Sequence, residues 1–125
     1  MKCPGLRVLL IDDDRVQLKM VSDLLRRIGH TCVAVADGRA GLRCLVGHPE
    51  IDVVLCDVIM PDMDGYQVLR CIRETHGSGV PVALMSATES QQSMQVETKF
   101  AANQYISKPV GLNDLRMLHA LVKNE

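Results

Sequence analysis

The sequence has no tryptophan, two tyrosines and one phenylalanine among its 125 residues. The core of the protein must therefore be built from aliphatic and methionine side chains, for which an apolar fraction of 47% is sufficient. Neither sign of charge is in excess, because 14 Lys and Arg against 15 Asp and Glu give a formal net charge of −1. This balance predicts that the segment binds neither nucleic acid directly nor an anionic membrane surface.

Three further absences narrow the class of protein. No stretch approaches the roughly 18 apolar residues that span a bilayer, and residues 1–5 lack the apolar segment of a signal peptide. We therefore expect no membrane association and a cytoplasmic location, or a nuclear one in a eukaryotic regulator. The five cysteines are widely spaced without a C-x-x-C pair, which argues against a zinc or redox motif. They are expected to be reduced thiols that act as small apolar residues.

Apolar runs alternate with helical patterns along the chain, whose length suits one domain. Five short apolar runs, at residues 6–11, 31–35, 51–56, 80–85 and 104–107, are typical of buried strands. Helical patterns follow them: one that stops at Gly29, one that Asp37 caps, and those of residues 65–76, 89–101 and 112–122. The alternation predicts an α/β fold, a doubly wound five-stranded parallel sheet with helices on both faces, as a single domain over residues 1–125.

Polar residues follow four of the five predicted strands. They are Asp12, Asp13 and Asp14 after the first strand, Asp57 after the third, Ser86 after the fourth and Lys108-Pro109 after the fifth. Because ligands of doubly wound sheets bind at the carboxyl ends of the strands, we expect these groups to lie together. Clustered carboxylates repel one another, and Mg²⁺ is a suitable counter-ion, since it prefers carboxylate, phosphate and water oxygens. A carboxylate beside magnesium can attack phosphorus, while a lysine and a hydroxyl hold the oxygens of the transferred group.

Each of these residues also has an ordinary structural explanation when it is taken alone. Asp14 suits the N-cap of the helix that follows, a Lys-Pro pair is usually a turn, and a serine after a strand is usually a cap. The functional interpretation therefore depends on their joint placement after four strands. The Lys108-Pro109 bond is also a candidate for the cis form, which would aim the ammonium back at the cluster.

Four segments of the sequence carry a more specific signal. They are residues 9–14 (LLIDDD), 56–65 (CDVIMPDMDG), 84–87 (LMSA) and 105–109 (YISKP). Together they resemble the receiver domain of two-component response regulators, and the resemblance covers the whole chain with every motif in order. The second segment, of the form D-x-x-M-P-x-M-D-G, is highly specific, whereas the other three are informative only together.

The resemblance assigns roles to the acidic cluster. Asp57 matches the aspartate that accepts the phosphoryl group, and Asp12 and Asp13 match the pair that positions Mg²⁺, Asp13 as a direct ligand and Asp12 through a bound water. The backbone carbonyl of Ile59 matches the position that completes the protein ligands of the metal. The implied reaction is a magnesium-dependent, self-catalysed phosphotransfer followed by slow autodephosphorylation, which makes the domain an enzyme in a limited sense.

The remaining matches concern the switch and its partners. Ser86 matches the hydroxyl that moves toward the phosphoryl group, Lys108 the lysine that pairs with that group, and Tyr105 the aromatic residue whose rotamer reports the state. Phosphorylation would alter the face made by the fourth helix, the fifth strand and the fifth helix. The implied partners are a histidine kinase or histidine phosphotransfer protein, an effector domain in the parent chain, and a second copy in a phosphorylation-dependent dimer.

Two departures from the family pattern bear on the rate of dephosphorylation. Ile59 and Thr88 stand where many family members carry polar or acidic side chains, which predicts slow hydrolysis of the phosphorylated form. Residues 100–103 (FAAN) replace the more usual Gly-Ala segment.

Two other classes of function are compatible with the fold. A pseudo-receiver, which would only bind other proteins, is disfavoured by the intact Asp57, Asp13 and Lys108. An unrelated doubly wound enzyme, or a carrier of flavin or nucleotide, is disfavoured because neither G-x-G-x-x-G nor G-x-x-x-x-G-K-[ST] follows the first strand.

Overall fold

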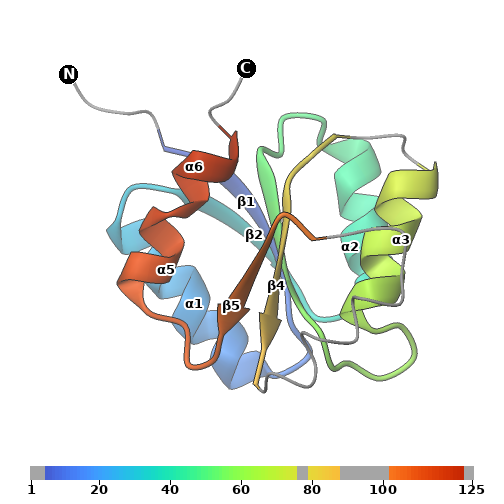
Figure 1. Ribbon diagram of the computed structural model, residues 1–125, viewed down its shortest axis with the longest axis horizontal. Coiled ribbons are helices and arrows are strands. Elements are labelled where there is room, and N and C mark those ends of the chain that lie inside the picture. Colours follow the sequence, from blue (N-terminus) through green and yellow to red (C-terminus); the bar gives the residue numbers. More distant parts are fainter. Residues whose placement is uncertain (1–4, 76–78, 88–101, 123–125) are drawn as a thin grey trace.

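The protein is built around a five-stranded parallel sheet (Figure 1). The computed structural model describes residues 5–75, 79–87 and 102–122. The strands are β1 (Arg7–Ile11), β2 (Thr31–Val35), β3 (Val53–Asp57), β4 (Val82–Ser86) and β5 (Gln104–Ser107). They lie in the order β2-β1-β3-β4-β5, and all four neighbouring pairs are parallel. The order reverses between β1 and β3, which makes their carboxyl ends the expected ligand site of this fold.

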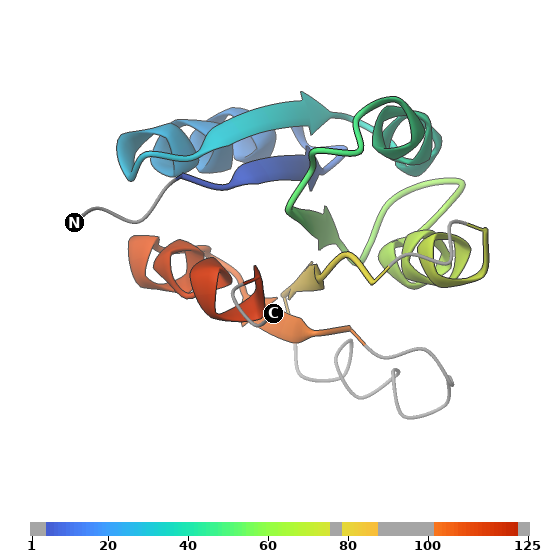
Figure 2. The same ribbon diagram turned by 90° about the horizontal axis from the view of Figure 1, so that it is seen from above.

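Helices cover both faces of the sheet, as predicted (Figures 1 and 2). One face carries α1 (Arg15–Arg27), α5 (Leu112–Arg116) and α6 (Leu118–Val122), and the other carries α2 (Gly38–Gly47) and α3 (Gly65–Thr75). The helix predicted over residues 89–101 lies outside the described residues. No helix in the described parts of the chain is long and apolar enough to cross a membrane.

Two hydrophobic cores form because successive strand residues point to opposite faces of the sheet. On the α1 and α5 side, alternate residues such as Val8, Leu10 and Leu55 pack against Val21 and Leu25 of α1. On the other side, the intervening strand residues Leu9, Ile11 and Val54 pack against Val68 and Ile72 of α3. Apart from Arg7, Asp57 and Ser86 at their ends, the central strands are therefore continuously apolar.

Aspartates begin the first two helices, as expected from the sequence. The Asp14 carboxylate accepts hydrogen bonds from the backbone N–H groups of Val16 and Gln17, and the Asp37 carboxylate accepts one from Ala40 at 2.7 Å. Each cap satisfies backbone donors that have no partner within the first helical turn. Both caps thus fix where a helix leaves the carboxyl edge of the sheet.

Helix α2 approaches the sheet and α3 more closely than a side chain would allow. A Cβ atom added to Gly38 would meet Val68 Cγ2 at 2.8 Å, and one added to Gly41 would overlap the Ile11 side chain. Both glycines are buried. The start of α2 is consequently fixed against β1 and the beginning of α3.

The C-terminal helix differs from the continuous helix predicted over residues 112–122. It is broken at Met117, whose side chain is 55% exposed, and the Ala120 N–H bonds to the Met117 carbonyl over three residues, the spacing of a 3₁₀ turn. Leu115 and Leu118 on either side of the break are both fully buried. The tighter turn lets both leucines face the core, and apolar spacing alone does not reveal it.

Candidate functional site

Three carboxylates meet at the carboxyl edge of the sheet, where β1 and β3 end. One oxygen from each of Asp12, Asp13 and Asp57 lies within 4.8 Å of the others. Asp12 and Asp57 are buried, whereas Asp13 is exposed. The structure thus brings together the acidic residues that the sequence placed after the first and third strands.

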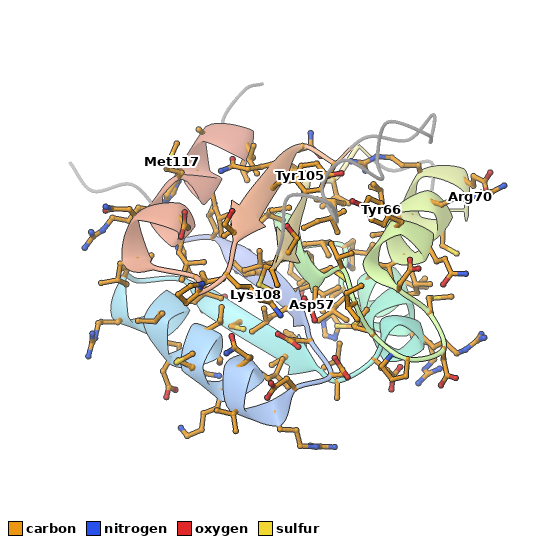
Figure 3. All side chains as sticks on the ribbon, turned by 60° about the horizontal axis from the view of Figure 1, so that its bottom comes forward. Asp57, Tyr66, Arg70, Tyr105, Lys108 and Met117 are labelled. Atoms are coloured by element: carbon orange, nitrogen blue, oxygen red, sulfur yellow. The ribbon has the colours of Figure 1, made fainter. Side chains whose placement is uncertain are left out.

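Lys108 completes this cluster from the end of β5. Its Nζ lies 2.7 Å from Asp57 Oδ1, and the two side chains are adjacent in Figure 3. The Lys108 backbone N–H donates to the Ser86 carbonyl at 2.9 Å, which ties this turn to the end of β4. The Lys108-Pro109 bond is cis, as the sequence suggested.

Asp12 is held in one orientation by its own loop. Its Oδ1 accepts the backbone N–H of Asp14 at 3.0 Å, while its Oδ2 is buried without a hydrogen-bond partner among the described residues. Burial raises the pKa of Asp12 to about 6, and the negative charges of Asp57 and Asp13 act in the same direction. An oxygen that is buried and unpaired suits direct or water-mediated contact with a cation.

Burial also raises the pKa of Asp57, although Lys108 opposes this rise through a hydrogen bond and its positive charge. Asp57 is 5% exposed, so little solvent stabilises its charge. One lysine faces three carboxylates, and the cluster therefore has room for further positive charge. The three carboxylates each place one oxygen within 4.8 Å of the others, and Asp13 is exposed to solvent. This ligand set fits Mg²⁺.

The loop after β3 curves tightly back onto the site. The Gly65 backbone N–H donates to the Val58 carbonyl at 2.8 Å, and a Cβ atom at Gly65 would lie 2.5 Å from the Asp57 carbonyl oxygen. A residue with a side chain would push the loop away from Asp57, which explains the glycine of the D-x-x-M-P-x-M-D-G pattern. Ile59 on this loop is 58% exposed, two positions beyond Asp57.

The two residues assigned to the switch lie on neighbouring strands. Ser86 is fully buried at the end of β4, and Tyr105 is half-buried on β5, paired in register with Leu84. The Tyr105 hydroxyl is buried beside the Tyr66 phenol. Burial, followed by the nearby Tyr66 phenol on α3, raises the pKa of Tyr105 (Figure 3). Thr88 lies outside the described residues.

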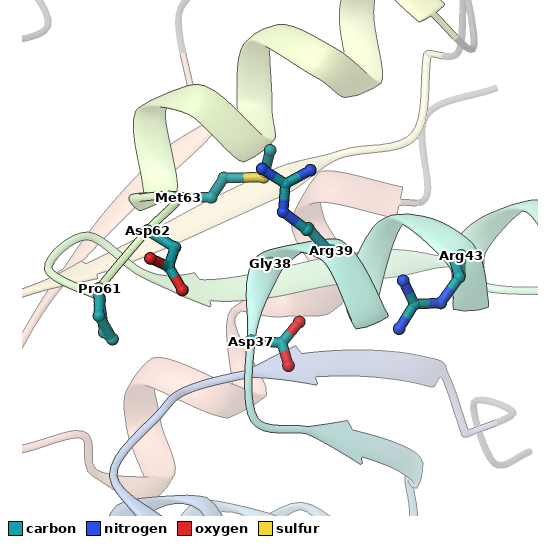
Figure 4. Close-up of a pocket in the computed structure, with 7 residues that line it drawn as sticks. All are labelled: Asp37, Gly38, Arg39, Arg43, Pro61, Asp62 and Met63. Atoms are coloured by element: carbon teal, nitrogen blue, oxygen red, sulfur yellow. The ribbon is translucent and has the colours of Figure 1, made fainter.

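A separate cavity of about 230 Å³ adjoins the tip of the same loop (Figure 4). It is lined by Asp37, Gly38, Arg39, Arg43, Pro61, Asp62 and Met63. Two carboxylates and two guanidinium groups give the lining no net charge. The cavity includes none of the clustered carboxylates, so the candidate site is the open acidic cluster rather than this pocket.

Two neighbours of the site were not predicted as such. Asp14 was expected to be a helix cap, but its backbone N–H also orients Asp12. Tyr66 was not singled out, although it is the only tyrosine in the sequence besides Tyr105 and lies next to it. The contact joins residues 39 positions apart on α3 and β5, and no local pattern in the sequence signals it.

The fold and the acidic cluster define a doubly wound α/β protein with a carboxylate site where the strand order reverses. Comparison with known proteins assigns the family. The sequence matches the response regulator receiver domain model over residues 8–120, and the chain belongs to this family. It is thus a receiver domain of two-component signal transduction, as the motifs indicated.

Two curated relatives illustrate the match. The chain is 36% identical to the two-component response regulator ORR25 of Oryza sativa subsp. japonica over 113 residues, which are 90% of this chain and 16% of the relative. It is 31% identical to the transcriptional regulatory protein CpxR of Escherichia coli K12 over 109 residues, 87% of this chain and 45% of the relative. The chain therefore spans less than half the length of either relative.

Solved structures agree with the fold. The chemotaxis protein CheY4 of Vibrio cholerae is 26% identical with a TM-score of 0.82, covering 94% of this chain and 98% of that one. The receiver domain of the sensor histidine kinase PA1611 from Pseudomonas aeruginosa PAO1 is 29% identical with a TM-score of 0.83, covering 96% and 99%. That structure has a magnesium ion coordinated in its active site cleft.

Proposed function

We propose that residues 1–125 form a phosphoacceptor domain in which Asp57 takes a phosphoryl group from a phosphohistidine. The observation that carries the proposal is the 2.7 Å ion pair between Lys108 Nζ and Asp57 Oδ1, set beside the carboxylates of Asp12 and Asp13. One phosphoryl group at this site could therefore reach the nucleophilic carboxylate of Asp57, the Lys108 ammonium and the carboxylates that would bind a metal ion. Membership of the receiver family supports the same assignment.

In the proposed transfer, one Asp57 oxygen attacks phosphorus in line with the departing imidazole nitrogen. The new O–P bond forms as the N–P bond breaks, and the imidazole leaves with the electron pair of that bond and takes up a proton. The product is an acyl phosphate on Asp57. The ionised carboxylate is the nucleophile, so the Lys108 ammonium, which opposes the effect of burial on the pKa of Asp57, keeps the reactive form available.

Asp12, Asp13 and Asp57 are the side chains that would hold Mg²⁺, Asp13 directly and Asp12 through a water, and Ile59 would add its backbone carbonyl. When bound, Mg²⁺ supplies positive charge that offsets repulsion between the carboxylates and stabilises the phosphoryl oxygens. The unpaired Asp12 Oδ2 supports this assignment because a buried carboxylate oxygen needs a partner. Asp13→Ala should therefore weaken magnesium binding measured by calorimetry.

Ser86 and Tyr105 are proposed to pass phosphorylation on to the surface. Ser86 follows Met85, the register partner of Asp57, and its carbonyl already binds the Lys108 N–H, so a shift at the phosphoryl group is felt there. Tyr105 has a buried hydroxyl beside the Tyr66 phenol, and exchanging this neighbour for another contact would give the side chain two positions. Backbone amide shifts recorded with and without beryllofluoride test this; changes confined to the loop after Asp57 would contradict it.

The donor is proposed to be a histidine kinase or a histidine phosphotransfer protein, because the relatives are two-component regulators. The output would be an effector domain in a longer chain or a dimer that forms on phosphorylation. The E. coli relative is named as a transcriptional regulator and is more than twice as long as the matched segment. These partners rest on the family and not on a docking surface in the structure.

The proposal is tested by incubating the protein with acetyl phosphate and Mg²⁺ and measuring its intact mass. We expect one added phosphoryl group, no addition in EDTA, and none in Asp57→Asn. Asp62→Asn is the matched control, since Asp62 is exposed on the same loop and lies outside the acidic cluster. Equal labelling of the Asp57→Asn variant and the parent would overturn the assignment.

A further inference from the structure

A buried histidine lies at the opposite edge of the sheet from Asp57. His30, in the turn between α1 and β2, is 4% exposed. Its ring Nδ1 accepts the backbone N–H of Leu6 at 3.0 Å, and its backbone N–H donates to the Leu25 carbonyl at 3.0 Å. The ring is thus fixed between the residue before β1 and the last turn of α1.

This hydrogen bond determines which ring nitrogen carries the proton. Because Nδ1 accepts, the neutral ring carries its hydrogen on Nε2. That N–H is buried and has no acceptor among the described residues. The neighbouring ring is that of His119 on α6, with centroids 5.2 Å apart and planes inclined by 56°. The His30 ring therefore meets a second histidine where a buried donor would ordinarily meet an acceptor.

A metal ion between the two rings is not the explanation. A metal bound to Nε2 needs the lone pair of that nitrogen, and ligating histidines donate a proton from the other ring nitrogen. Here Nδ1 instead accepts a hydrogen bond and carries no proton, so a metal on Nε2 would require both ring nitrogens to be deprotonated. The arrangement is consistent with a neutral imidazole and with no bound cation.

A second proton on His30 would have to bind Nδ1 and would displace the Leu6 N–H. It would also create a buried positive charge opposite His119, and burial, followed by His119, lowers the pKa of His30. The other charged groups nearby in sequence are Arg7 of β1 and the arginines that end α1, which are also cations. Among the described residues, no carboxylate contributes to the pKa shift of His30.

The segment that carries His30 is held more firmly in the fold than the segment that carries His119. On the His30 side, the Thr31 N–H bonds to the Leu6 carbonyl at 2.9 Å and continues the β1–β2 pairing. On the other side, α6 is five residues long, follows the break at Met117, and has one fully buried side chain, Leu118. Repulsion between the rings would therefore displace α6 before it disturbed the sheet.

We propose that His30 and His119 form an acid-sensitive latch, in which protonation of His30 loosens the packing of α6 against the sheet. This latch is separate from phosphorylation, since it lies at the other end of the strands from Asp57. Protonation of His30 is the step that loosens the contact, and the element that responds is the last helix of the domain.

The latch is tested by NMR between pH 7.5 and pH 5. In the parent, the protection of the Leu6 amide, corrected for the intrinsic exchange rate, should fall by up to about tenfold per pH unit below the ordinary histidine pKa. The Leu118 methyl signals should shift toward their unfolded positions over the same range. In His30→Asn, whose amide oxygen can accept the Leu6 N–H but takes up no proton, both signals should be independent of pH. An acid response in His30→Asn equal to that of the parent would overturn the proposal.

Two controls keep the test decisive. His48→Gln and Asp12→Asn remove an exposed histidine and the carboxyl that titrates near pH 6, and the response of α6 should persist in both. If His30→Asn does not fold, the imidazole signals decide. The pKa of His30 should lie below that of a free histidine in the parent and should rise in His119→Gln. An unshifted pKa in both proteins would contradict the latch.

Discussion

The two ends of the sheet treat polar groups in opposite ways. At the carboxyl ends, three carboxylates face each other with a single lysine, and one buried oxygen of Asp12 has no partner among the described residues. At the amino ends of β4 and β5, polar groups pair with one another. Arg73 donates to the Val80 carbonyl at 2.7 Å and to Asn103 Oδ1 at 2.9 Å, and the same oxygen accepts the Val82 N–H at 2.8 Å.

This difference separates structure from function within one sheet. The Arg73 network joins α3, β4 and the start of β5, and its described groups satisfy each other, so it stabilises the fold without a ligand. The acidic cluster lowers the stability of the free protein, because its buried carboxylates repel one another. Binding of a cation would offset this repulsion and prepare the site for a phosphoryl group. The destabilising acidic cluster is hence a stronger indication of the activity of the domain than the stabilising Arg73 network.

The largest effect is expected from removing the cation of the acidic cluster. Lys108→Ala should slow phosphorylation by acetyl phosphate on the order of a hundredfold to a thousandfold, because a fixed charge that stabilises the transferred group is lost. Time courses of intact mass in saturating Mg²⁺ measure this rate. Lys19→Ala, which removes an exposed lysine paired with Asp23, should leave it unchanged. A Lys108→Ala variant as fast as the parent would show that the ion pair is merely structural.

The amino-end network should respond in stability rather than activity. Arg73→Met should lower the free energy of unfolding by about 2–3 kcal/mol, because the Val80 carbonyl loses its guanidinium donor and Asn103 one of its two donors. Urea unfolding measures the change. The matched control on the same helix is Arg70→Met, whose exposed pair with Glu74 should contribute less than about 1 kcal/mol. Equal losses in the two variants would remove the contrast between the half-buried Arg73 and the exposed Arg70.

Neutralising a carboxylate of the acidic cluster should raise the free energy of unfolding, whereas Arg73→Met lowers it. The pKa of Asp12 is raised from 3.8 to about 6, so the folded state binds its proton more tightly than the unfolded state. The parent therefore loses stability as pH rises from about 4 to 6, and this loss is complete above pH 6. In EDTA at pH 8, Asp12→Asn should raise the free energy of unfolding by about 1–2 kcal/mol.

The gain of Asp12→Asn should shrink below pH 5 and should be offset by Mg²⁺, which stabilises the parent by binding its folded state. Asp23→Asn, on the exposed face of α1, serves as the control and should change little. A stability of Asp12→Asn equal to that of the parent at pH 8 would mean that burial of this carboxylate costs nothing.

The smallest effect concerns the lifetime of the acyl phosphate. Ile59 offers no group that could orient the attacking water, so Ile59→Asn should shorten the lifetime by about threefold to tenfold. The decay of phosphorylated protein, followed by intact mass with Mg²⁺ present, measures it. Ile59→Val keeps the position apolar and should decay like the parent. Identical decay of all three proteins would show that water access is controlled elsewhere.

The fold was predictable because both of its signals are local. Apolar runs located the five strands to within two residues, and the aspartates at positions 14 and 37 located two helix starts. The site followed from one topological rule, that strand ends share an edge. The break at Met117 was not predictable, since Leu115, Leu118 and Leu121 keep helical spacing through it.

Contacts between distant segments were equally hidden from the sequence. Arg73 and Asn103 are 30 residues apart, and Leu6 and His30 are 24 apart. In each pair, neither residue stands out from its local pattern. The carboxylates were recognisable because they end apolar strands, whereas a half-buried arginine on a helix or a buried histidine in a turn looks like an ordinary residue of that element.

The close contacts of Gly38 and Gly41 constrain how this protein can diverge over evolutionary time. The outer face of α2, which includes Arg39 and Val46, is exposed and can accept substitutions without disturbing a contact of the core. At the two glycines, a larger residue would require a smaller one at Val68 or Ile11 in the same lineage. Descendants of this chain should therefore change Gly38 together with Val68 and Gly41 together with Ile11, or keep all four residues. The outer face of α2 should vary quickly, while its inner face stays nearly constant.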